Sequence, residues 1–128
     1  MDLGLNDIKA TLADYFDGIY ESSEDKLRSA FHPDAHIYSA TDGTLADFPL
    51  DTFVDRVTSR KSCSSQGAPR TDKIVSIDFS GPNSALAKVE LSIPGTDFVD
   101  FLSLMKIDGR WRIIAKTYHA DPQADMPD

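Results

Sequence analysis

Apolar residues in the first part of the chain recur every three or four positions, which is the period of an amphipathic helix. This stripe consists of Leu5, Ile8, Leu12, Tyr15, Phe16 and Ile19. A second, short helix is predicted from the apolar residues of 27–31, with Ser22 and Asp25 at the spacing of a capping box and Pro33 as its stop. Asp51 is positioned to cap a third helix that turns the apolar residues of 53–57 inward. The pattern therefore predicts three helices in the N-terminal half.

The other segments alternate apolar and polar residues with a period of two, as β-strands do. A small hairpin is predicted where residues 35–39 and 44–48 flank the turn Asp42-Gly43. Four longer strands follow, at 73–79, 85–93, 98–107 and 111–119. The turns between them are too short for a parallel crossover, so these four strands form an antiparallel meander. Helices followed by a meander predict an α+β fold with the helices on one face of the sheet.

The last hairpin has an explicit register if Asp108-Gly109 is a two-residue loop, because Ile107 then pairs with Arg110. Counting outward, Asp100 lies opposite Thr117 and Phe98 lies opposite His119. One face then collects Phe98, Asp100, Leu102, Leu104, Trp111, Ile113, Ala115, Thr117 and His119. The other face collects Val99, Phe101, Ser103, Met105, Arg112, Ile114, Lys116 and Tyr118. This register poses a choice: either Asp100 with His119 or Lys116 with Tyr118 faces the helices.

Composition narrows the class of protein. A chain of 128 residues with 41% hydrophobic residues can bury one continuous core, so we expect a single domain over 1–128, with an acidic, flexible tail at 121–128. With 21 acidic against 13 basic residues the net charge is -8, which disfavours nucleic acid and anionic membranes as partners. The absence of a long apolar stretch and of a signal-peptide pattern predicts a cytoplasmic location.

Metal and cofactor signals are weak. The lone Cys63 excludes an internal disulfide and a site built from several thiolates. The histidines His32, His36 and His119 lack the short spacing of chelating pairs. The chain has no Gly-rich phosphate loop, nucleophile elbow or dinucleotide fingerprint. We therefore expect no metal and no cofactor.

Two stretches resemble a known superfamily. The run Phe31-His32-Pro33-Asp34-Ala35 resembles the Phe-x-x-Asp-Ala step of the nuclear transport factor 2-like superfamily. The terminal hairpin, residues 99–104 and 106–116, resembles the putative lumazine-binding family within it, which is polyketide-cyclase-like. The resemblance runs from about Leu5 to His119. It implies a cystatin-like cone in which three N-terminal helices pack on a curved antiparallel sheet.

The superfamily implies a pocket but not one activity, since its members include ketosteroid isomerases, polyketide cyclases, dehydratases and binding or transport proteins. Ketosteroid isomerase uses an Asp base with a Tyr and a protonated Asp as oxyanion hole. Counting from the shared Ala35, its tyrosine falls on Tyr15 and its base on Ser39, while Asp100 lies near the second acid. A serine cannot abstract a carbon-bound proton unaided, which argues against isomerase chemistry.

The leading hypothesis is a small-molecule binding protein for a mostly apolar or aromatic ligand. Its predicted pocket residues are Tyr15, Ile19, Tyr38, Phe53, Asp100 and His119. The alternative is an isomerase-, cyclase- or dehydratase-type enzyme with Asp100 and His119 as the acid-base pair and Tyr15 as oxyanion donor. A simpler interpretation gives Asp100 a structural hydrogen bond to Thr117 or to a backbone amide.

A third hypothesis comes from the other strand face. Its residues Phe101, Met105, Ile107, Ile114 and Tyr118 form an apolar surface that needs a cover. This surface predicts a homodimer that pairs sheet to sheet.

Overall fold

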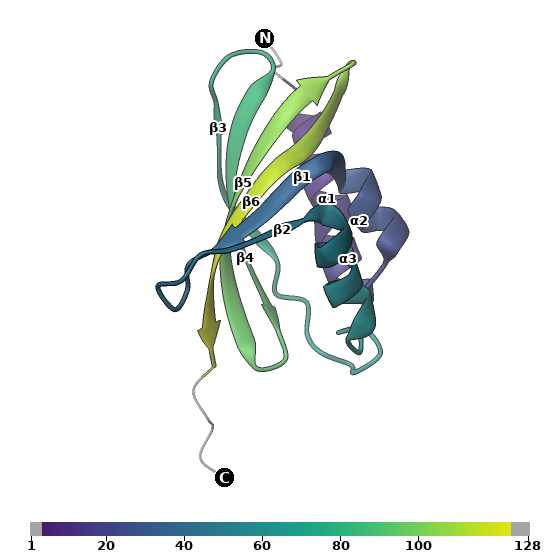
Figure 1. Ribbon diagram of the computed structural model, residues 1–128. Coiled ribbons are helices and arrows are strands. Elements are labelled where there is room, and N and C mark those ends of the chain that lie inside the picture. The colour runs from purple at the N-terminus through teal and green to yellow at the C-terminus, as the bar shows by residue number, and fades with distance from the viewer. Residues whose placement is uncertain (1–3, 124–128) are drawn as a thin grey trace.

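A computed structural model describes residues 4–123, and Figure 1 shows its helices on one side of a curved sheet. In chain order the elements are α1 (Leu5–Glu21), α2 (Glu24–Ala30), β1 (Phe31–Ser39), β2 (Ala46–Pro49), α3 (Leu50–Ser59), β3 (Lys73–Phe79), β4 (Ser84–Ile93), β5 (Thr96–Ile107) and β6 (Arg110–Pro122). The strands follow the order β2-β1-β6-β5-β4-β3. The predicted α+β fold, with three N-terminal helices packed on a curved sheet, is confirmed.

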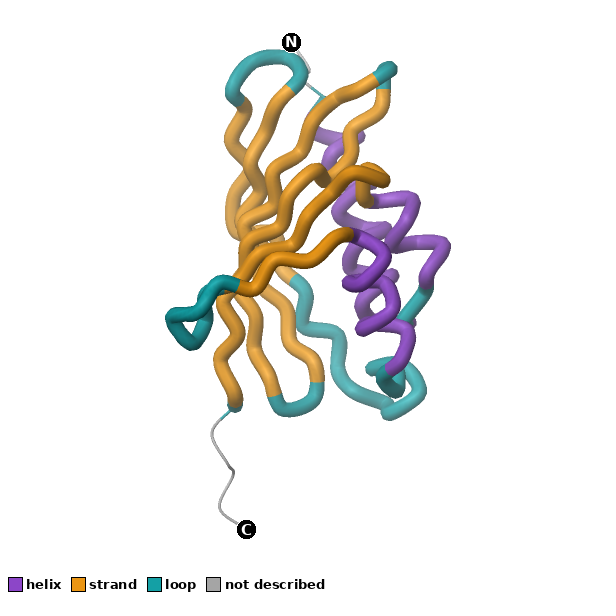
Figure 2. Tube along the Cα trace, in the orientation of Figure 1, coloured by secondary structure: helices purple, strands orange, loops and turns teal. Residues whose placement is uncertain are grey.

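The sheet joins the two predicted strand groups. Strands β3 to β6 form the predicted antiparallel meander, and β1 pairs with β2 as the predicted hairpin. The join itself was not predicted: β1 runs parallel to β6, with Ile37 opposite Lys116. A parallel pair needs a long connection, and the chain from β2 through β5 supplies it. Figure 2 shows the continuous sheet that results.

Two predicted helix caps are wrong. Ser22 ends α1 with a positive φ of 52°, and the next residue, Ser23, caps α2 by accepting a hydrogen bond from the Lys26 N–H at 3.3 Å. Helix α3 begins directly after Pro49, so Asp51 lies inside its first turn, where its carboxylate accepts from Arg28 Nη1 at 2.9 Å. The negative charge still favours that helix end through the helix dipole.

Helix α1 buries its predicted stripe against the sheet and α2. Ile8, Leu12 and Tyr15 are fully buried. A Cβ at Gly18 would lie 2.7 Å from Leu27 Cδ2 and 3.1 Å from the Leu27 nitrogen. Since real side chains do not approach that closely, the absence of a side chain at Gly18 is what lets α2 pack against α1.

Strand β6 extends further than predicted. Asp121 and Pro122 pair with Asp97 and Thr96 of β5, so these two residues belong to the sheet and not to a flexible tail. The rest of the predicted tail, from residue 124, lies outside the described residues. Within 4–123, no helix has the length and apolar character that crossing a membrane requires.

Candidate functional site

A β-bulge in β6 decides which side chains lie beneath the helices. The hairpin begins in the predicted register, with Ile107 opposite Arg110 and Leu104 opposite Ile113. The next pair is Ser103 with Ala115, so Ile114 is an extra residue on β6. Beyond this point the alternation of β6 is reversed relative to β5.

The bulge corrects the predicted faces. Asp100 lies opposite Tyr118, not Thr117, and Phe98 lies opposite Ala120, not His119. Asp100 therefore shares the helix-facing side of the sheet with Lys116, which the predicted register assigns to the other side. The predicted pairing of Asp100 with His119 is wrong, because His119 now pairs with Val99 on the outer face and its Nε2 lies 2.9 Å from Asp121 Oδ1.

Tyr15, Asp100 and Lys116 form a buried cluster. The Tyr15 hydroxyl donates to Asp100 Oδ2 at 2.6 Å, and Lys116 Nζ donates to the Tyr15 oxygen at 2.7 Å. Lys116 Nζ also lies 3.9 Å from Asp100 Oδ2. Tyr15 and Asp100 are fully buried and Lys116 is 5% exposed, while Asp100 Oδ1 is buried with no hydrogen-bond partner. Burial of charged groups is unfavourable for folding, so this cluster is a candidate for a functional role.

Aromatic rings surround the Lys116 ammonium. Its Nζ lies 4.5 Å from the ring centroid of Phe53, 5.1 Å from that of Tyr118 and 5.2 Å from that of Tyr15. Such contacts attract a cation, but aromatic walls also exclude water from it.

Burial shifts the pKa values of the cluster. It lowers the pKa of Lys116 from its ordinary value of 10.5; the negative charge of Asp100 opposes this shift, and the positive charge of Arg60 adds to it. Burial raises the pKa of Tyr15 well above 10.0, and the charge of Asp100 and the hydrogen bond to it raise it further. Tyr15 therefore keeps its proton, while the Lys116 amine loses its proton at a lower pH than an exposed lysine does.

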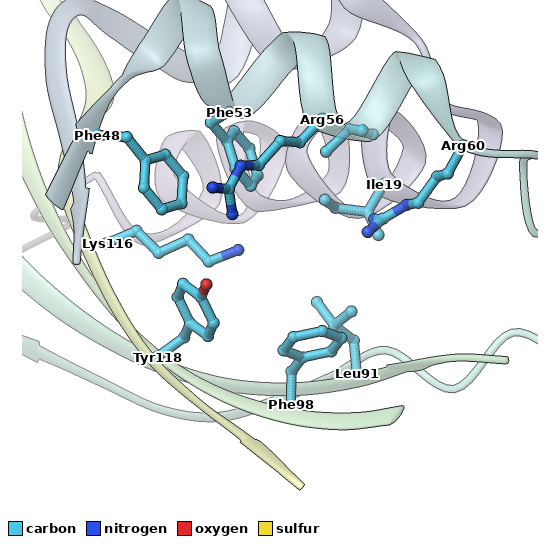
Figure 3. A pocket seen from close by; sticks show the side chains of 10 residues that line it. Ile19, Phe48, Phe53, Arg56, Arg60, Leu91, Phe98, Lys116 and Tyr118 are labelled. Atoms are coloured by element: carbon cyan, nitrogen blue, oxygen red, sulfur yellow. The ribbon is translucent and has the colours of Figure 1, made fainter. Parts of the chain in front are cut away.

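Lys116 lies at one wall of a cavity of about 100 Å³ between α1, α3 and the sheet. The lining residues are Ile19, Phe48, Phe53, Arg56, Val57, Arg60, Leu91, Phe98, Lys116 and Tyr118. Figure 3 shows the nitrogen ends of Arg56, Arg60 and Lys116 directed into this space. Arg56 lies on α3 and Arg60 is the residue that directly follows this helix, and the Arg56 guanidinium stacks 4.4 Å from the Phe48 ring centroid. Within 4–123, none of the lining residues is acidic.

The structure separates the predicted pocket residues into three groups. Ile19 and Phe53 line the cavity. Tyr15 and Asp100 lie behind Lys116 and are connected to the cavity through its amine. Tyr38 and His119 lie elsewhere: Tyr38 stacks against His36 on the face of β1 opposite the buried Ile37, and His119 is on the outer face of β6.

Two basic residues of the cavity, Arg56 and Arg60, were not predicted. Lys116 was predicted to face the helices only as an alternative to Asp100, because the bulge that brings both to that side was not anticipated. Arg56 belongs to the polar side of an amphipathic helix and Arg60 to its end, where exposure to solvent is the usual expectation. Their four-residue spacing, next to the apolar 53–57 segment, was the available signal for a shared basic wall.

Comparison with solved structures places this fold in the nuclear transport factor 2-like class. An NTF2-like protein of unknown function from Shewanella baltica OS155 is 28% identical, with 92% of this chain and 94% of that chain covered and a TM-score of 0.82. A domain with a cystatin-like fold from Nostoc punctiforme PCC 73102 is 16% identical, with 88% and 74% covered and a TM-score of 0.68, and shows the same fold.

Within this class, the chain belongs to the family described as "Putative lumazine-binding", whose family model matches residues 5–119. The chain is also 30% identical over 119 residues, 89% of each chain, to a Cladobotryum sp. protein named Aldolase FrzH. The resemblance seen in the sequence is therefore confirmed at the level of the family.

Proposed function

We propose that this protein binds a small, largely aromatic or apolar molecule that carries an anionic or carbonyl group, in the cavity between α1, α3 and the sheet. Seven of the lining side chains are aliphatic or aromatic and would contact the body of the ligand. The other three, Arg56, Arg60 and Lys116, would receive its polar group.

The observation that carries this proposal is the charge of the cavity. The chain as a whole has a net charge of -8, yet the cavity contains basic side chains and no acidic one among its described lining residues. Arg56 and Arg60 form no ion pair with a carboxylate within 4–123. Unpaired guanidinium groups beside aromatic walls suit a planar carboxylate or an enolate, which Arg binds in bidentate fashion.

The size of the cavity favours a small ligand. A volume of about 100 Å³ is below the ~150 Å³ of an engineered cavity that holds benzene. Arg56 and Arg60 are exposed residues with long side chains, and rotation of either side chain outward would enlarge the cavity. The family description suggests lumazine, a fused heteroaromatic with two carbonyl groups, as one member of the class to test.

The test compares ligands that differ in charge alone. Isothermal titration of 4-(hydroxymethyl)benzoate and of the matching 4-(hydroxymethyl)benzamide should give tighter binding for the carboxylate. Arg60→Gln and Arg56→Gln should each weaken binding of the carboxylate about tenfold, because each variant loses one charge-assisted contact. Arg112→Gln, which changes an arginine of β6 outside the cavity, is the matched control. Equal affinity for acid and amide, or no binding of either compound or of lumazine, would refute the proposal.

A second candidate function is catalysis on a carbonyl compound, with Lys116 as the group that contacts the substrate. Two observations support it. Lys116 lies at the cavity wall and is hydrogen-bonded to Tyr15, which is hydrogen-bonded to Asp100. The Cladobotryum relative is named an aldolase. The activity would differ from the expected Asp100–His119 chemistry, because His119 lies on the outer face.

Proton exchange tests this candidate directly. NMR in D₂O would follow the methyl protons of 4-acetylbenzoate, which exchange when the ketone enolises. We expect faster exchange with the protein than with buffer, and loss of the acceleration in Lys116→Met. If the ketone binds but its methyl protons exchange no faster than in buffer, catalysis is contradicted and the protein only binds its ligand.

We also propose that the outer face of the sheet joins two copies of the chain. Val75, Leu86, Phe101, Met105 and Ile107 are each between 40% and 47% exposed there, on β3, β4 and β5. Tyr118, which was predicted for this face, instead lines the cavity on the other side of the sheet. Clustered apolar exposure of this kind is typical of an interface. Sedimentation velocity should detect a dimer that Phe101→Asp dissociates and that Leu45→Asp, in an exposed loop, leaves intact. A monomeric wild-type protein at micromolar concentration would contradict this.

A further inference from the structure

We infer that Lys116 is a nucleophilic amine that forms an imine with an aldehyde or ketone held in the cavity. The substrate class is a small aromatic carbonyl compound that also carries a carboxylate, with the carboxylate at Arg56 and Arg60 and the carbonyl carbon at Lys116 Nζ. This inference rests on the proposed ligand site, because an imine requires a bound carbonyl group.

The position of Lys116 is the first support. Of the lysines within 4–123, Lys116 is the one that is buried, and it is the one that lines the cavity. Its Nζ uses one N–H to donate to the oxygen of Tyr15, which is not among the residues that line the cavity. A neutral amine held in this way can direct its electron pair toward the cavity, where a carbonyl carbon would lie.

The surroundings of Lys116 increase the fraction of its amine that is neutral. Burial lowers its pKa, and the nearby positive charge of Arg60 acts in the same direction, against the effect of Asp100. When the pKa of a lysine falls by one, the fraction of free amine at a pH below that pKa rises about tenfold. Desolvation beside a second cationic group is an established way to activate a lysine for attack on a carbonyl.

The cluster can also carry the protons that imine formation requires. Lys116 Nζ passes a proton to the Tyr15 oxygen as the Tyr15 hydroxyl proton moves to Asp100 Oδ2, along the contacts of 2.7 and 2.6 Å. The amine electron pair then forms the C–N bond, and the carbonyl oxygen takes the proton that nitrogen releases. The stored proton returns from Asp100 through Tyr15 to the nitrogen, which passes it to the carbinol oxygen, and that oxygen leaves as water. The nitrogen electron pair closes the C=N bond, which leaves a protonated imine beside the Asp100 carboxylate.

Reductive trapping tests the inference. The full chain is incubated with 4-formylbenzoate and cyanoborohydride, which reduces an imine to a stable secondary amine, and the labelled lysines are identified by peptide mapping. We expect Lys116 to be labelled faster than the exposed Lys73 and Lys106, because it is held beside the bound carbonyl group and its pKa is lowered by burial. Excess 4-(hydroxymethyl)benzoate, which fills the same site without a carbonyl, should suppress the label at Lys116 and leave the others unchanged.

The outcomes separate this inference from the proposed function. If 4-(hydroxymethyl)benzoate binds but the label falls only on exposed lysines, the imine is refuted and the binding site stands. If 4-(hydroxymethyl)benzoate does not bind and Lys116 is not labelled, both are refuted. Lys116→Arg should lose the label; if that variant does not fold, the comparison among lysines within the wild-type chain still decides.

Tyr15 is a positioning residue in this scheme, and its role has its own readout. Tyr15→Phe should slow trapping at Lys116 about a hundredfold, the usual contribution of a proton-transfer group, and change its pH profile. Binding of 4-(hydroxymethyl)benzoate should stay the same. A merely structural role for Tyr15 predicts weaker binding of the carboxylate with an unchanged pH profile of trapping, which would contradict the proton path.

Discussion

The two ends of helix α1 lie over regions of opposite character. At the apolar end, which we define by Ile8, Leu12, Leu104, Trp111 and Ile113, every side chain is at most 3% exposed and none is charged. At the cavity end, which we define by Tyr15, Ile19, Asp100, Lys116 and Arg60, buried charges border an open space. In each region a hydrogen bond connects α1 to β6: near the apolar end Thr11 Oγ1 donates to the Trp111 carbonyl at 2.9 Å, and at the cavity end the Tyr15 oxygen accepts from Lys116 Nζ at 2.7 Å.

The bulge at Ile114 marks the boundary between these regions on β6. Before it, Trp111 and Ile113 face the helices; after it, Lys116 does. The apolar end follows the rule that a core is closely packed and uncharged. The cavity end departs from that rule in charge and in packing together, as we expect of the ligand site that we propose.

The largest expected effect comes from truncating the same residue type at both ends of α1. Ile8→Ala should lower the free energy of unfolding by about 3–4 kcal/mol, because it leaves a void in a fully packed region. Ile19→Ala should lower it by only about 1–2 kcal/mol, since that side chain already borders a cavity and loses fewer contacts. Urea unfolding of both variants measures the difference. Equal losses would mean that the two ends are packed alike.

The next effect separates the members of the buried cluster. Tyr15→Phe should lower the free energy of unfolding by about 1–3 kcal/mol, because Asp100 then loses the hydrogen bond to Oδ2 while Oδ1 already has none. The double variant Asp100→Asn/Lys116→Met should change it by less than about 1 kcal/mol or raise it, since it removes both charges of the buried pair together.

Urea unfolding of the two variants, with the wild type in parallel, checks this order. A loss in the double variant as large as that of Ile8→Ala would show that the buried Asp100–Lys116 pair is needed for stability, as core residues are. The proposed functional reason for its burial would then be unnecessary.

The same boundary explains how far the sequence could predict the molecule. The apolar end was predicted because two periods agree there: the three- and four-residue spacing of Ile8 and Leu12, and the alternation of Trp111 with Ile113. Both signals depend only on residues that are near one another in the chain. The register of the hairpin next to its turn was correct for the same reason.

The cavity end could not be predicted in the same way, since one extra residue reverses a strand. The bulge at Ile114 contains no Gly or Pro that would mark it in the sequence, so regular alternation was the natural expectation, and it put Asp100 and Lys116 on opposite faces. Tyr15 and Asp100 were nevertheless predicted as pocket residues, because the apolar stripe of α1 and the strand β5 were both predicted correctly. Their contact with Lys116 depends on the β6 bulge and the β1–β6 pairing, neither of which leaves a local signal.

A smaller effect concerns pH. The folded pKa of Lys116 lies below 10.5, so between these two values the unfolded chain binds more protons and stability rises with pH. Below the folded pKa, both states are protonated and the burial penalty is constant. The unfolding free energy of the wild type, minus that of Lys116→Met, should therefore increase from neutral pH toward pH 10. The increase should be about 1.4 kcal/mol for each pH unit that separates the folded pKa of Lys116 from its unfolded value.

Tyr15 changes stability with pH in the opposite direction, but its contribution is removed when the unfolding free energy of Lys116→Met is subtracted from that of the wild type. Its folded pKa lies well above 10.0, so above pH 10.0 the unfolded chain loses this proton first and stability falls as pH rises. Both proteins keep Tyr15, so its contribution cancels to first order. A difference that is flat or that falls with pH would mean that the pKa of Lys116 is not lowered in the folded protein.

The smallest expected effect on stability belongs to Arg60, and it separates the two regions most clearly. Arg60→Gln removes an exposed residue whose guanidinium points into the cavity, so the free energy of unfolding should change by no more than about 0.5 kcal/mol, as for Arg112→Gln. The rise in Tm that saturating 4-(hydroxymethyl)benzoate produces should shrink for Arg60→Gln only, because a ligand stabilises the folded state in proportion to the logarithm of its affinity. Thermal unfolding with and without the ligand measures both quantities. A large loss of stability without the ligand would place Arg60 among the residues that hold the fold together, and the cavity end would then resemble the apolar end more than its charges suggest.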